Sequence, residues 1–283
     1  MSYKINKLIT TAQNFYLSTK GNLLSNKIDA YWWSDIKNFG DLLTPFLLKK
    51  YNLTPIKKDE NSSHLFSTGS ILQRAPESFS GTILGSGLIE PSKRRFPNAK
   101  VLSVRGPLTR DFIGADKDVS LGDPGLLVSR FVEKPDPSFQ VGVVPHYKDK
   151  EHPKIKEIIK FFGKDALLID VCRKPKDVIN DIAKCSVIIS SSLHGLIVGH
   201  SFCLPCVWLR LGNIPGTDFK YQDYFASVGF SQAPFFSSDI KSITDLKNSA
   251  TAPQPDIIRE KILETHFLFE AFSRSVLNST NRP

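Results

Sequence analysis

The sequence predicts an α/β protein with two Rossmann-like domains that face each other across a cleft. Two observations predict this fold class. Short β-rich runs alternate with helix-like stretches, and the alternation stops at the linker Glu133-Lys134-Pro135-Asp136-Pro137 before it starts again. Alternating strands and helices favour parallel sheets, because parallel neighbours need a crossover connection. We therefore expect an N-terminal domain at 1–135 and a C-terminal domain at 136–283.

In the first half, β-rich runs end in glycine and small polar residues, and helix-like stretches follow several of them. Glycine at the end of a strand lets the backbone approach a ligand closely. The expected strands lie at 28–33, 64–67, 82–84, 101–104 and 119–121, and the expected helices lie at 42–51, 108–113 and 125–131.

The second half repeats the pattern and ends in a long helix at 256–277, which is long enough to return to the first domain. Apolar residues at helical spacing also predict an amphipathic helix at 3–17 that packs on the protein's own core, with a membrane surface as the alternative. The other expected strands lie at 139–144, 166–170, 186–189 and 205–209, and the other helices at 154–162, 176–184, 196–202 and 221–228.

Composition limits the classes of function. With 283 residues, of which 41% are hydrophobic, the chain can bury a substantial core. The net charge of +9 indicates an anionic partner such as a phosphorylated metabolite, a nucleic acid or an acidic membrane. The basic residues are spread along the chain without an arginine-rich tract, which argues against nucleic acid. Without a long apolar run or a secretion signal, we expect a cytoplasmic protein, with peripheral contact at the inner membrane surface as an alternative.

The junction Ser190-Ser191-Ser192-Leu193-His194-Gly195 is the most informative stretch, because it closes one apolar run and opens another. In open α/β sheets, ligands bind outside the carboxyl ends of strands, where the next helix points unpaired N–H groups. A histidine among small hydroxyl side chains can hold and protonate an anion there. The alternative is structural: Ser191 or Ser192 caps the helix, and His194 bonds to a backbone carbonyl.

Short motifs follow one another in a fixed order between about residues 28 and 230. They are Asn38-Phe39-Gly40-Asp41, Leu43-Thr44-Pro45, Gly85-Ser86-Gly87, Val104-Arg105-Gly106-Pro107-Leu108-Thr109, Gly122-Asp123-Pro124, Pro145-His146-Tyr147, Ser191-Ser192-Leu193-His194-Gly195-Leu196-Ile197 and Phe219-Lys220-Tyr221-Gln222-Asp223-Tyr224. Together they make the chain similar to the polysaccharide pyruvyl transferase family, in particular to the ketal pyruvyltransferases of bacterial exopolysaccharide synthesis. Their joint occurrence in order is far more specific than any one motif.

The resemblance implies a fold like that of the two-domain (GT-B) glycosyltransferases, with phosphoenolpyruvate as the donor. It also implies transfer of the pyruvyl unit to a pair of hydroxyls on a sugar, in a surface polysaccharide or its lipid-linked precursor, as a cyclic ketal. A eukaryotic member of the family carries an arginine two residues before its active-site histidine, where this chain has Ser192. Another cation must therefore complete the anion site.

Ketal formation needs an acid, a base and groups that bind anions. We expect His194 to be the acid or a phosphate contact, Asp41 to orient or deprotonate the acceptor hydroxyl, and Arg105 to bind the carboxylate or the phosphate. The structural alternatives are an N-cap role for Asp41 and a salt bridge for Arg105. The further candidates for substrate binding are Asn38, Gly40, Gly69, Ser70, Gly85, Ser86, Gly87, His146, Ser191, Ser192, Gly195, Arg210 and Lys220.

We expect no cofactor apart from the donor substrate and no metal. The glycine-rich loops match neither the dinucleotide fingerprint nor the P-loop. Asp116-Lys117-Asp118 resembles the acidic pair that binds a metal in some sugar-nucleotide transferases, but it precedes a strand instead of ending one, so we expect it to be a solvated loop. Two other functions stay open, because a fold does not determine its chemistry. One is a GT-B glycosyltransferase that uses a nucleotide sugar, and the other is a non-enzymatic module that binds a sugar polymer or a membrane surface.

Overall fold

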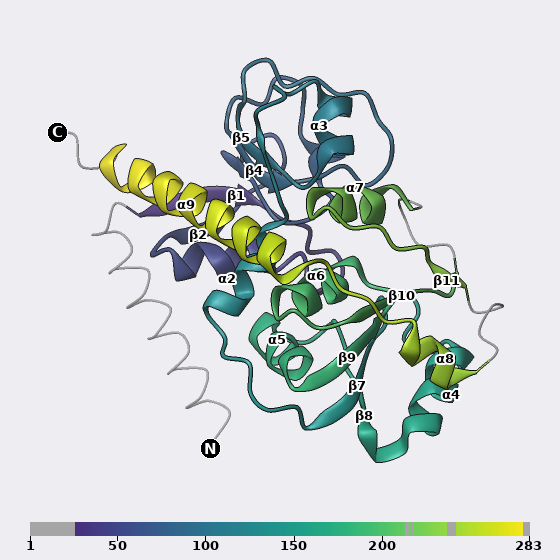
Figure 1. The fold of residues 1–283 in the computed structure, drawn as a ribbon. Coiled ribbons are helices and arrows are strands. Elements are labelled where there is room, and N and C mark those ends of the chain that lie inside the picture. Colours follow the sequence, from purple (N-terminus) through teal and green to yellow (C-terminus); the bar gives the residue numbers. More distant parts are fainter. Residues whose placement is uncertain (1–25, 213–215, 217, 237–241, 280–283) are drawn as a thin grey trace.

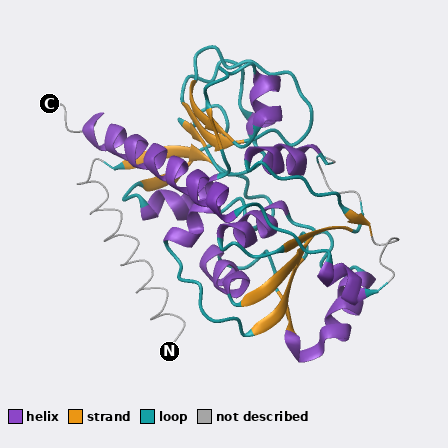
Figure 2. Cartoon of the chain, viewed as in Figure 1, coloured by secondary structure: helices purple, strands orange, loops and turns teal. Residues whose placement is uncertain are grey.

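The computed structural model describes residues 26–212, 216, 218–236 and 242–279, and its strands form two separate sheets (Figures 1 and 2). The strands are β1 (Lys27–Tyr31), β2 (Thr54–Lys57), β3 (Leu65–Phe66), β4 (Thr82–Ser86), β5 (Lys100–Val104), β6 (Ser120–Leu121), β7 (Phe139–Val144), β8 (Ala166–Leu168), β9 (Cys185–Ser190), β10 (Cys206–Arg210) and β11 (Phe235–Phe236). The first sheet has the order β2-β1-β3-β4-β5-β6 and the second the order β11-β10-β9-β7-β8. Neighbouring strands are parallel throughout both sheets. The α/β class with parallel sheets is confirmed, while the boundary at 135 and the cleft stay predictions.

The helices are close to the predicted ranges, with one change of type. The predicted helix at 125–131 is a 3₁₀ helix, η2 (Pro124–Arg130), in which the Asp123 carboxylate accepts the Gly125 N–H at 2.8 Å and begins a tight turn. The expected helix at 3–17 lies outside the described residues. The α-helices are α2 (Leu43–Lys50), α3 (Pro107–Ile113), α4 (Pro153–Phe162), α5 (Pro175–Ala183), α6 (Leu193–Ser201), α7 (Phe219–Ser227), α8 (Ile243–Asn248) and α9 (Pro255–Ser279).

Helix α6 lies at the centre of the molecule, and all of its residues are buried. A helix that is buried on every side belongs to the interior, in contrast to an amphipathic surface helix. One apolar cluster contains Leu196 and Ile197 of α6, Leu47 of α2 and Leu84 of β4 in the first half, and Trp208 of β10 in the second. The two sheets are therefore joined by a shared core.

Helix α9 runs back across the first sheet (Figure 1). Its Ser273 hydroxyl donates to the Tyr51 carbonyl at 2.7 Å, and the Tyr51 hydroxyl lies 2.8 Å from His266 Nδ1. Ile258 and Phe269 of α9 belong to the same apolar cluster as α6. The helix thus covers the core that both sheets share.

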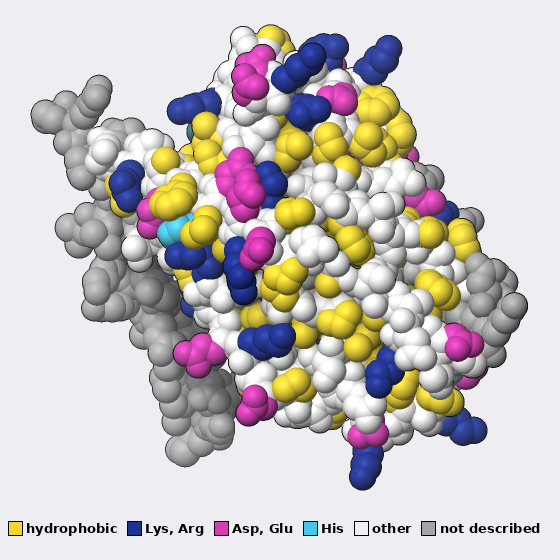
Figure 3. Space-filling model, viewed as in Figure 1, with side chains coloured by type: hydrophobic (Ala, Val, Ile, Leu, Met, Phe, Trp, Pro, Cys, Tyr) yellow, Lys and Arg dark blue, Asp and Glu magenta, His cyan; other side chains and the backbone are white. Residues whose placement is uncertain are grey.

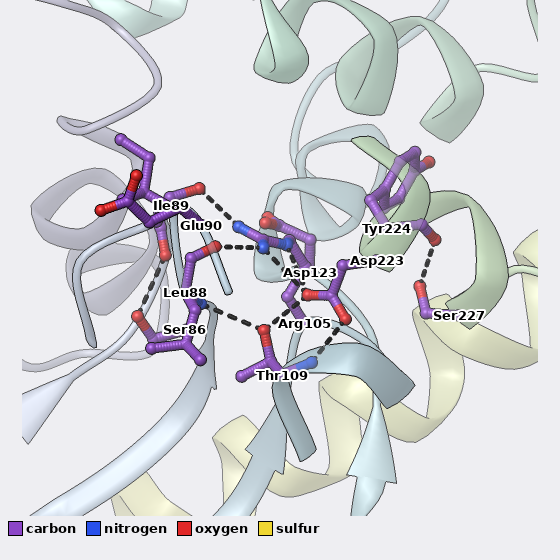
Figure 4. A network of polar contacts seen from close by, with 12 residues as sticks. Ser86, Leu88, Ile89, Glu90, Arg105, Thr109, Asp123, Asp223, Tyr224 and Ser227 are labelled. Carbon is purple, nitrogen blue, oxygen red and sulfur yellow. Dashed lines mark hydrogen bonds and ion pairs between the residues drawn. The ribbon is translucent and has the colours of Figure 1, made fainter. Parts of the chain in front are cut away.

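Arg105, at the end of β5, forms a fully buried ion pair with Asp223 of α7 (Figure 4). Its Nη2 lies 2.9 Å from Asp223 Oδ2, and its Nε donates to the same oxygen at 3.0 Å. Asp223 also accepts the backbone N–H of Thr109 at 2.8 Å and its hydroxyl at 2.6 Å. The carboxylate therefore ties α7 to both β5 and α3.

The described surface can be compared with the expected membrane contact only on the face seen in Figure 3 and for its helices. On the described part of the face seen in Figure 3, basic and acidic side chains are mixed, so this face does not gather the net charge of +9. Among the described helices, none combines the length and the apolar character needed to cross a bilayer.

Asp223→Ala should lower the free energy of unfolding by about 3–5 kcal/mol, because Arg105 would remain buried without its partner. Asp218→Ala is the matched control, since Asp218 pairs with Arg210 just before α7 but both side chains are partly exposed. The free energy of unfolding lost in Asp218→Ala should stay under about 1 kcal/mol. Urea unfolding of both variants checks the difference, and similar losses would contradict it.

Candidate active site

A pocket of about 310 Å³ lies where the carboxyl ends of strands from both sheets meet. Ser70 follows β3, His146 follows β7 and Ser192 follows β9, so these residues come from segments far apart in sequence. This is where ligands bind in open parallel sheets. The complete lining is Trp33, Asn38, Asp41, Ser70, Ile71, Arg74, Ile89, His146, Tyr147, Ser192, Leu193, His194 and Lys220.

The serines of the junction connect strand ends to each other. Ser190 Oγ donates to the Val144 carbonyl at 2.8 Å and accepts the Ser192 N–H at 3.0 Å. Ser191 Oγ accepts the His146 N–H at 2.9 Å. Ser192 is the N-cap residue of α6 without a side-chain cap bond, so the predicted structural alternative of a serine cap is wrong.

His194 lies in the first turn of α6, and its two ring nitrogens have different surroundings. Nδ1 packs against Gly40, where an added Cβ would lie 2.2 Å from it. Nε2 is enclosed without a hydrogen-bond partner and lies 3.9 Å from Asp123 Oδ2, which is also buried and unpartnered. The alternative in which His194 bonds to a backbone carbonyl is therefore wrong for Nε2.

The pKa of His194 is lowered to about 3, first by burial and then by the positive charges of Arg105 and Lys220. Burial raises the pKa of Asp123 to about 6, partly opposed by the Gly125 N–H and by Arg105. At neutral pH the imidazole is therefore uncharged and the Asp123 carboxyl is mostly ionised. An uncharged imidazole can accept a proton.

Asp41 faces the pocket from the loop before α2. The helix begins after Leu42 without any side-chain cap, so the predicted alternative of an Asp41 cap is wrong. Burial raises the pKa of Asp41 to about 7, while Lys220 and a hydrogen bond from Asn38 oppose the shift. A carboxyl with this pKa holds a proton part of the time at neutral pH.

Lys220, in the first turn of α7, is the buried cation of the pocket, with 7% of its surface exposed. No hydrogen bond joins its ammonium to a described residue, and the Tyr221 ring lies 5.4 Å away. Its pKa falls to about 8 through burial and the charge of Arg105, although Asp41 and Asp149 oppose this. The pKa of His146 falls to about 4, mainly through burial.

Several predicted residues lie behind the pocket wall and do not line it. Arg105 is enclosed by Asp223, Ser70 and the Leu88 carbonyl, which matches the salt-bridge alternative. An added Cβ on Gly87 would lie 2.4 Å from Arg105 Cζ, so this glycine makes room for the guanidinium. The substrate contacts expected of these residues stay predictions. The predicted residues outside the lining are Gly40, Gly69, Gly85, Ser86, Gly87, Arg105, Ser191, Gly195 and Arg210.

Sequence reasoning missed part of the lining and the carboxylate that lies 3.9 Å from His194 Nε2. Asp123 stands in a glycine-containing loop after a strand, which is the signal that could have identified it. Trp33 and Tyr147 also follow strand ends closely. Arg74 lies in the short 3₁₀ helix η1 (Leu72–Arg74), and nothing in its local sequence marks it.

A larger pocket of about 570 Å³ lies elsewhere, between Phe96, Ile113 and Val119. Its described lining contains none of the residues of the Ser190–Gly195 junction. Because it lacks a buried histidine or lysine, it is the weaker candidate for proton transfer or for binding an anion.

Comparison with known proteins agrees with the motifs. The profile of the polysaccharide pyruvyl transferase family matches residues 20–213. Over 192 residues the chain is 34% identical to the uncharacterized protein L143 of Acanthamoeba polyphaga mimivirus, and the aligned region covers 62% of this chain and 65% of that protein. Over 212 residues it is 27% identical to the succinoglycan biosynthesis protein ExoV of Rhizobium meliloti (strain 1021), and the aligned region covers 72% of this chain and 66% of that protein. The chain thus spans just under two thirds of the length of each relative.

Asp41→Asn should change the pH dependence of stability. The pKa of Asp41 is 3.8 in the unfolded chain and about 7 in the folded protein. Between these two pH values, Asp41 is therefore protonated more often in the folded protein than in the unfolded chain. The stability contributed by Asp41 is therefore present at low pH and is lost as the pH rises through this window. Because asparagine does not ionise, the variant should gain stability relative to wild type across the window.

Urea unfolding at several pH values checks this expectation, with Asp118→Asn at an exposed position as the control. A difference between Asp41→Asn and wild type that stays flat, or that falls as the pH rises, would show that Asp41 does not carry the shift.

Proposed function

The chain belongs to the polysaccharide pyruvyl transferase family, and on this premise we propose that it moves the pyruvyl unit of phosphoenolpyruvate onto a pair of sugar hydroxyls. The products are a cyclic ketal and phosphate, and the sugar belongs to a surface polysaccharide or its lipid-linked precursor. The observation that carries this proposal is the convergence of Asp41, His194 and Lys220 in one pocket at the strand ends of both sheets.

The pocket offers several groups that suit the anionic donor. Phosphoenolpyruvate carries a carboxylate and a phosphate on one small unit, so it requires more than one positive or N–H donor group. Lys220 supplies a buried ammonium, and the uncapped first turn of α6 supplies backbone N–H groups beside Ser192. Arg74 adds a guanidinium at the rim. Lys220 is our candidate for the cation that replaces the arginine expected at Ser192.

The two pKa shifts favour roles opposite to those expected from sequence. Asp41, with a pKa near 7, is suited to donate a proton. His194, whose pKa near 3 keeps it uncharged, has a free ring nitrogen, which becomes a better proton acceptor once the negative charges of the donor offset the positive charges of Arg105 and Lys220. In this scheme Asp41 protonates the methylene carbon, and the first hydroxyl oxygen bonds to the neighbouring carbon as its proton passes to His194. The bond to the phosphate oxygen then breaks, and the proton on His194 leaves with the phosphate. The second hydroxyl oxygen bonds to the same carbon and returns a proton to Asp41.

Asp123 is the natural positioning partner for His194. With Nε2 near the buried Asp123 carboxylate, the proton of the neutral imidazole resides on Nε2, and the lone pair of Nδ1, beside Gly40, is left to accept a proton. The separation of 3.9 Å is too long for a hydrogen bond. Such contacts often tighten when substrate binds.

The experiment is an assay of phosphate release from phosphoenolpyruvate with sugar acceptors, together with detection of the ketal methyl group by NMR. His194→Gln should lower kcat by about 100- to 10,000-fold, because it removes the proton acceptor. Lys220→Met should mainly raise KM for phosphoenolpyruvate, and Lys164→Met at an exposed position is the matched control.

The outcome also separates the alternatives. Consumption of a nucleotide sugar without phosphate release from phosphoenolpyruvate would favour the glycosyltransferase. Sugar binding that survives His194→Gln without any turnover by the wild-type protein would favour the non-enzymatic module.

A further inference from the structure

A second pocket, of about 460 Å³, adjoins the candidate active site. Trp33 and Arg74 line both pockets, so these side chains form the wall between them. The rest of the second pocket comes from the end of β1 and the loop after it, and from the end of β2 and the loop after it. Its lining is Tyr31, Trp32, Trp33, Ser34, Asp35, Lys57, Lys58, Asp59, Glu60 and Arg74.

The shared wall is a cation–π pair with unused hydrogen-bond donors. The Arg74 guanidinium carbon lies 4.0 Å from the centroid of the Trp33 ring. No hydrogen bond or ion pair joins the Arg74 side chain to a described residue, so its N–H groups are available. A guanidinium over an indole ring keeps its N–H donors for other groups, and Arg74 lines both pockets, where a ligand could use them.

Tyr31 supplies a second unused polar group. Only 5% of its surface is exposed, and its hydroxyl makes no hydrogen bond with a described residue. Burial raises the pKa of Tyr31 to about 12, and the charges of Arg74, Glu60 and Asp35 also act on it. Tyr31 lines the second pocket together with these three charged residues.

The second pocket suits an uncharged ligand rich in hydroxyl groups. Its lysines already have partners, since Lys57 donates to Ser34 and Lys58 lies 3.9 Å from Asp29. Asp35 and Glu60 have no such partners among the described residues, and carboxylates accept hydrogen bonds from hydroxyls but repel phosphate. A nucleoside diphosphate is therefore disfavoured here.

We propose that the second pocket binds a further sugar residue of the acceptor, so that an oligosaccharide lies across Trp33 and Arg74 with its reacting sugar in the candidate active site. This proposal rests on the proposed function, because it names the length of the acceptor for that reaction. The indole rings of Trp32 and Trp33 cover the C–H face of a sugar, Asp35 and Glu60 accept from its hydroxyls, and Arg74 and Tyr31 donate to it.

The test measures binding without chemistry. Tetrasaccharide fragments of bacterial exopolysaccharides and their terminal monosaccharides are titrated, as a panel, into the full-length protein. The wild-type protein should bind at least one tetrasaccharide about ten times more tightly than its monosaccharide, and the double variant Asp35→Asn/Glu60→Gln should lose this gain. Tyr31→Phe, which keeps the ring in the core, should lose part of it. Glu77→Gln/Glu133→Gln, at exposed positions, is the matched control.

Titration with phosphoenolpyruvate tells the two proposals apart. Length-dependent glycan binding that is lost in the double variant supports the second pocket, even if the wild-type protein never releases phosphate from phosphoenolpyruvate and the proposed function fails. Turnover with a KM that is independent of acceptor length keeps the proposed function and overturns the second pocket. Equal loss of glycan and phosphoenolpyruvate binding in the double variant, or binding of no tetrasaccharide in the panel, also overturns it.

Discussion

The buried ion pair between Arg105 and Asp223 is the interaction on which the arrangement of the site depends. Its partners lie 118 residues apart in sequence, one at a strand end of the first sheet and the other on α7. A buried charge is tolerated only with a partner in good geometry, so the position of α7 is closely determined. Lys220 lies one turn before Asp223 on the same helix, and the ion pair thereby holds this cation in the pocket.

The polar groups of the pocket occupy the end of an otherwise apolar interior. Helix α6 is buried along its whole length, and only its first turn reaches the pocket. This burial accounts for the low pKa of His194 and, at the facing loop, for the high pKa of Asp41. The same apolar core that joins the sheets therefore prepares the acid and the base.

Local sequence patterns predicted the parallel sheets and many of the strand-end loops well, because strand and helix periodicity and glycine at loop positions are short-range signals. They located Asp41, His146 and His194 in segments that do line the pocket. They could not show that Arg105 is enclosed, because its partner Asp223 comes from a distant helix.

Arg74 was missed for a related reason. Arg74 lies over the Trp33 ring at the pocket, and such a contact between separate segments leaves no mark in the sequence around Arg74. The capping roles considered for Asp41 and Ser192 were reasonable for these residue types. Here Asp41 turns to the pocket, and the neighbouring hydroxyl Ser190 accepts the Ser192 N–H.

Helix α9 follows all the described strands in sequence, yet it packs on the core that the two sheets share. During synthesis on the ribosome, both sheets emerge before the helix that covers them. The apolar surface around Tyr51, on which Phe269 of α9 packs, therefore stays open to water, and to chaperones, until that helix has left the exit tunnel. The core that the two sheets share can therefore close only after α9 has been synthesised.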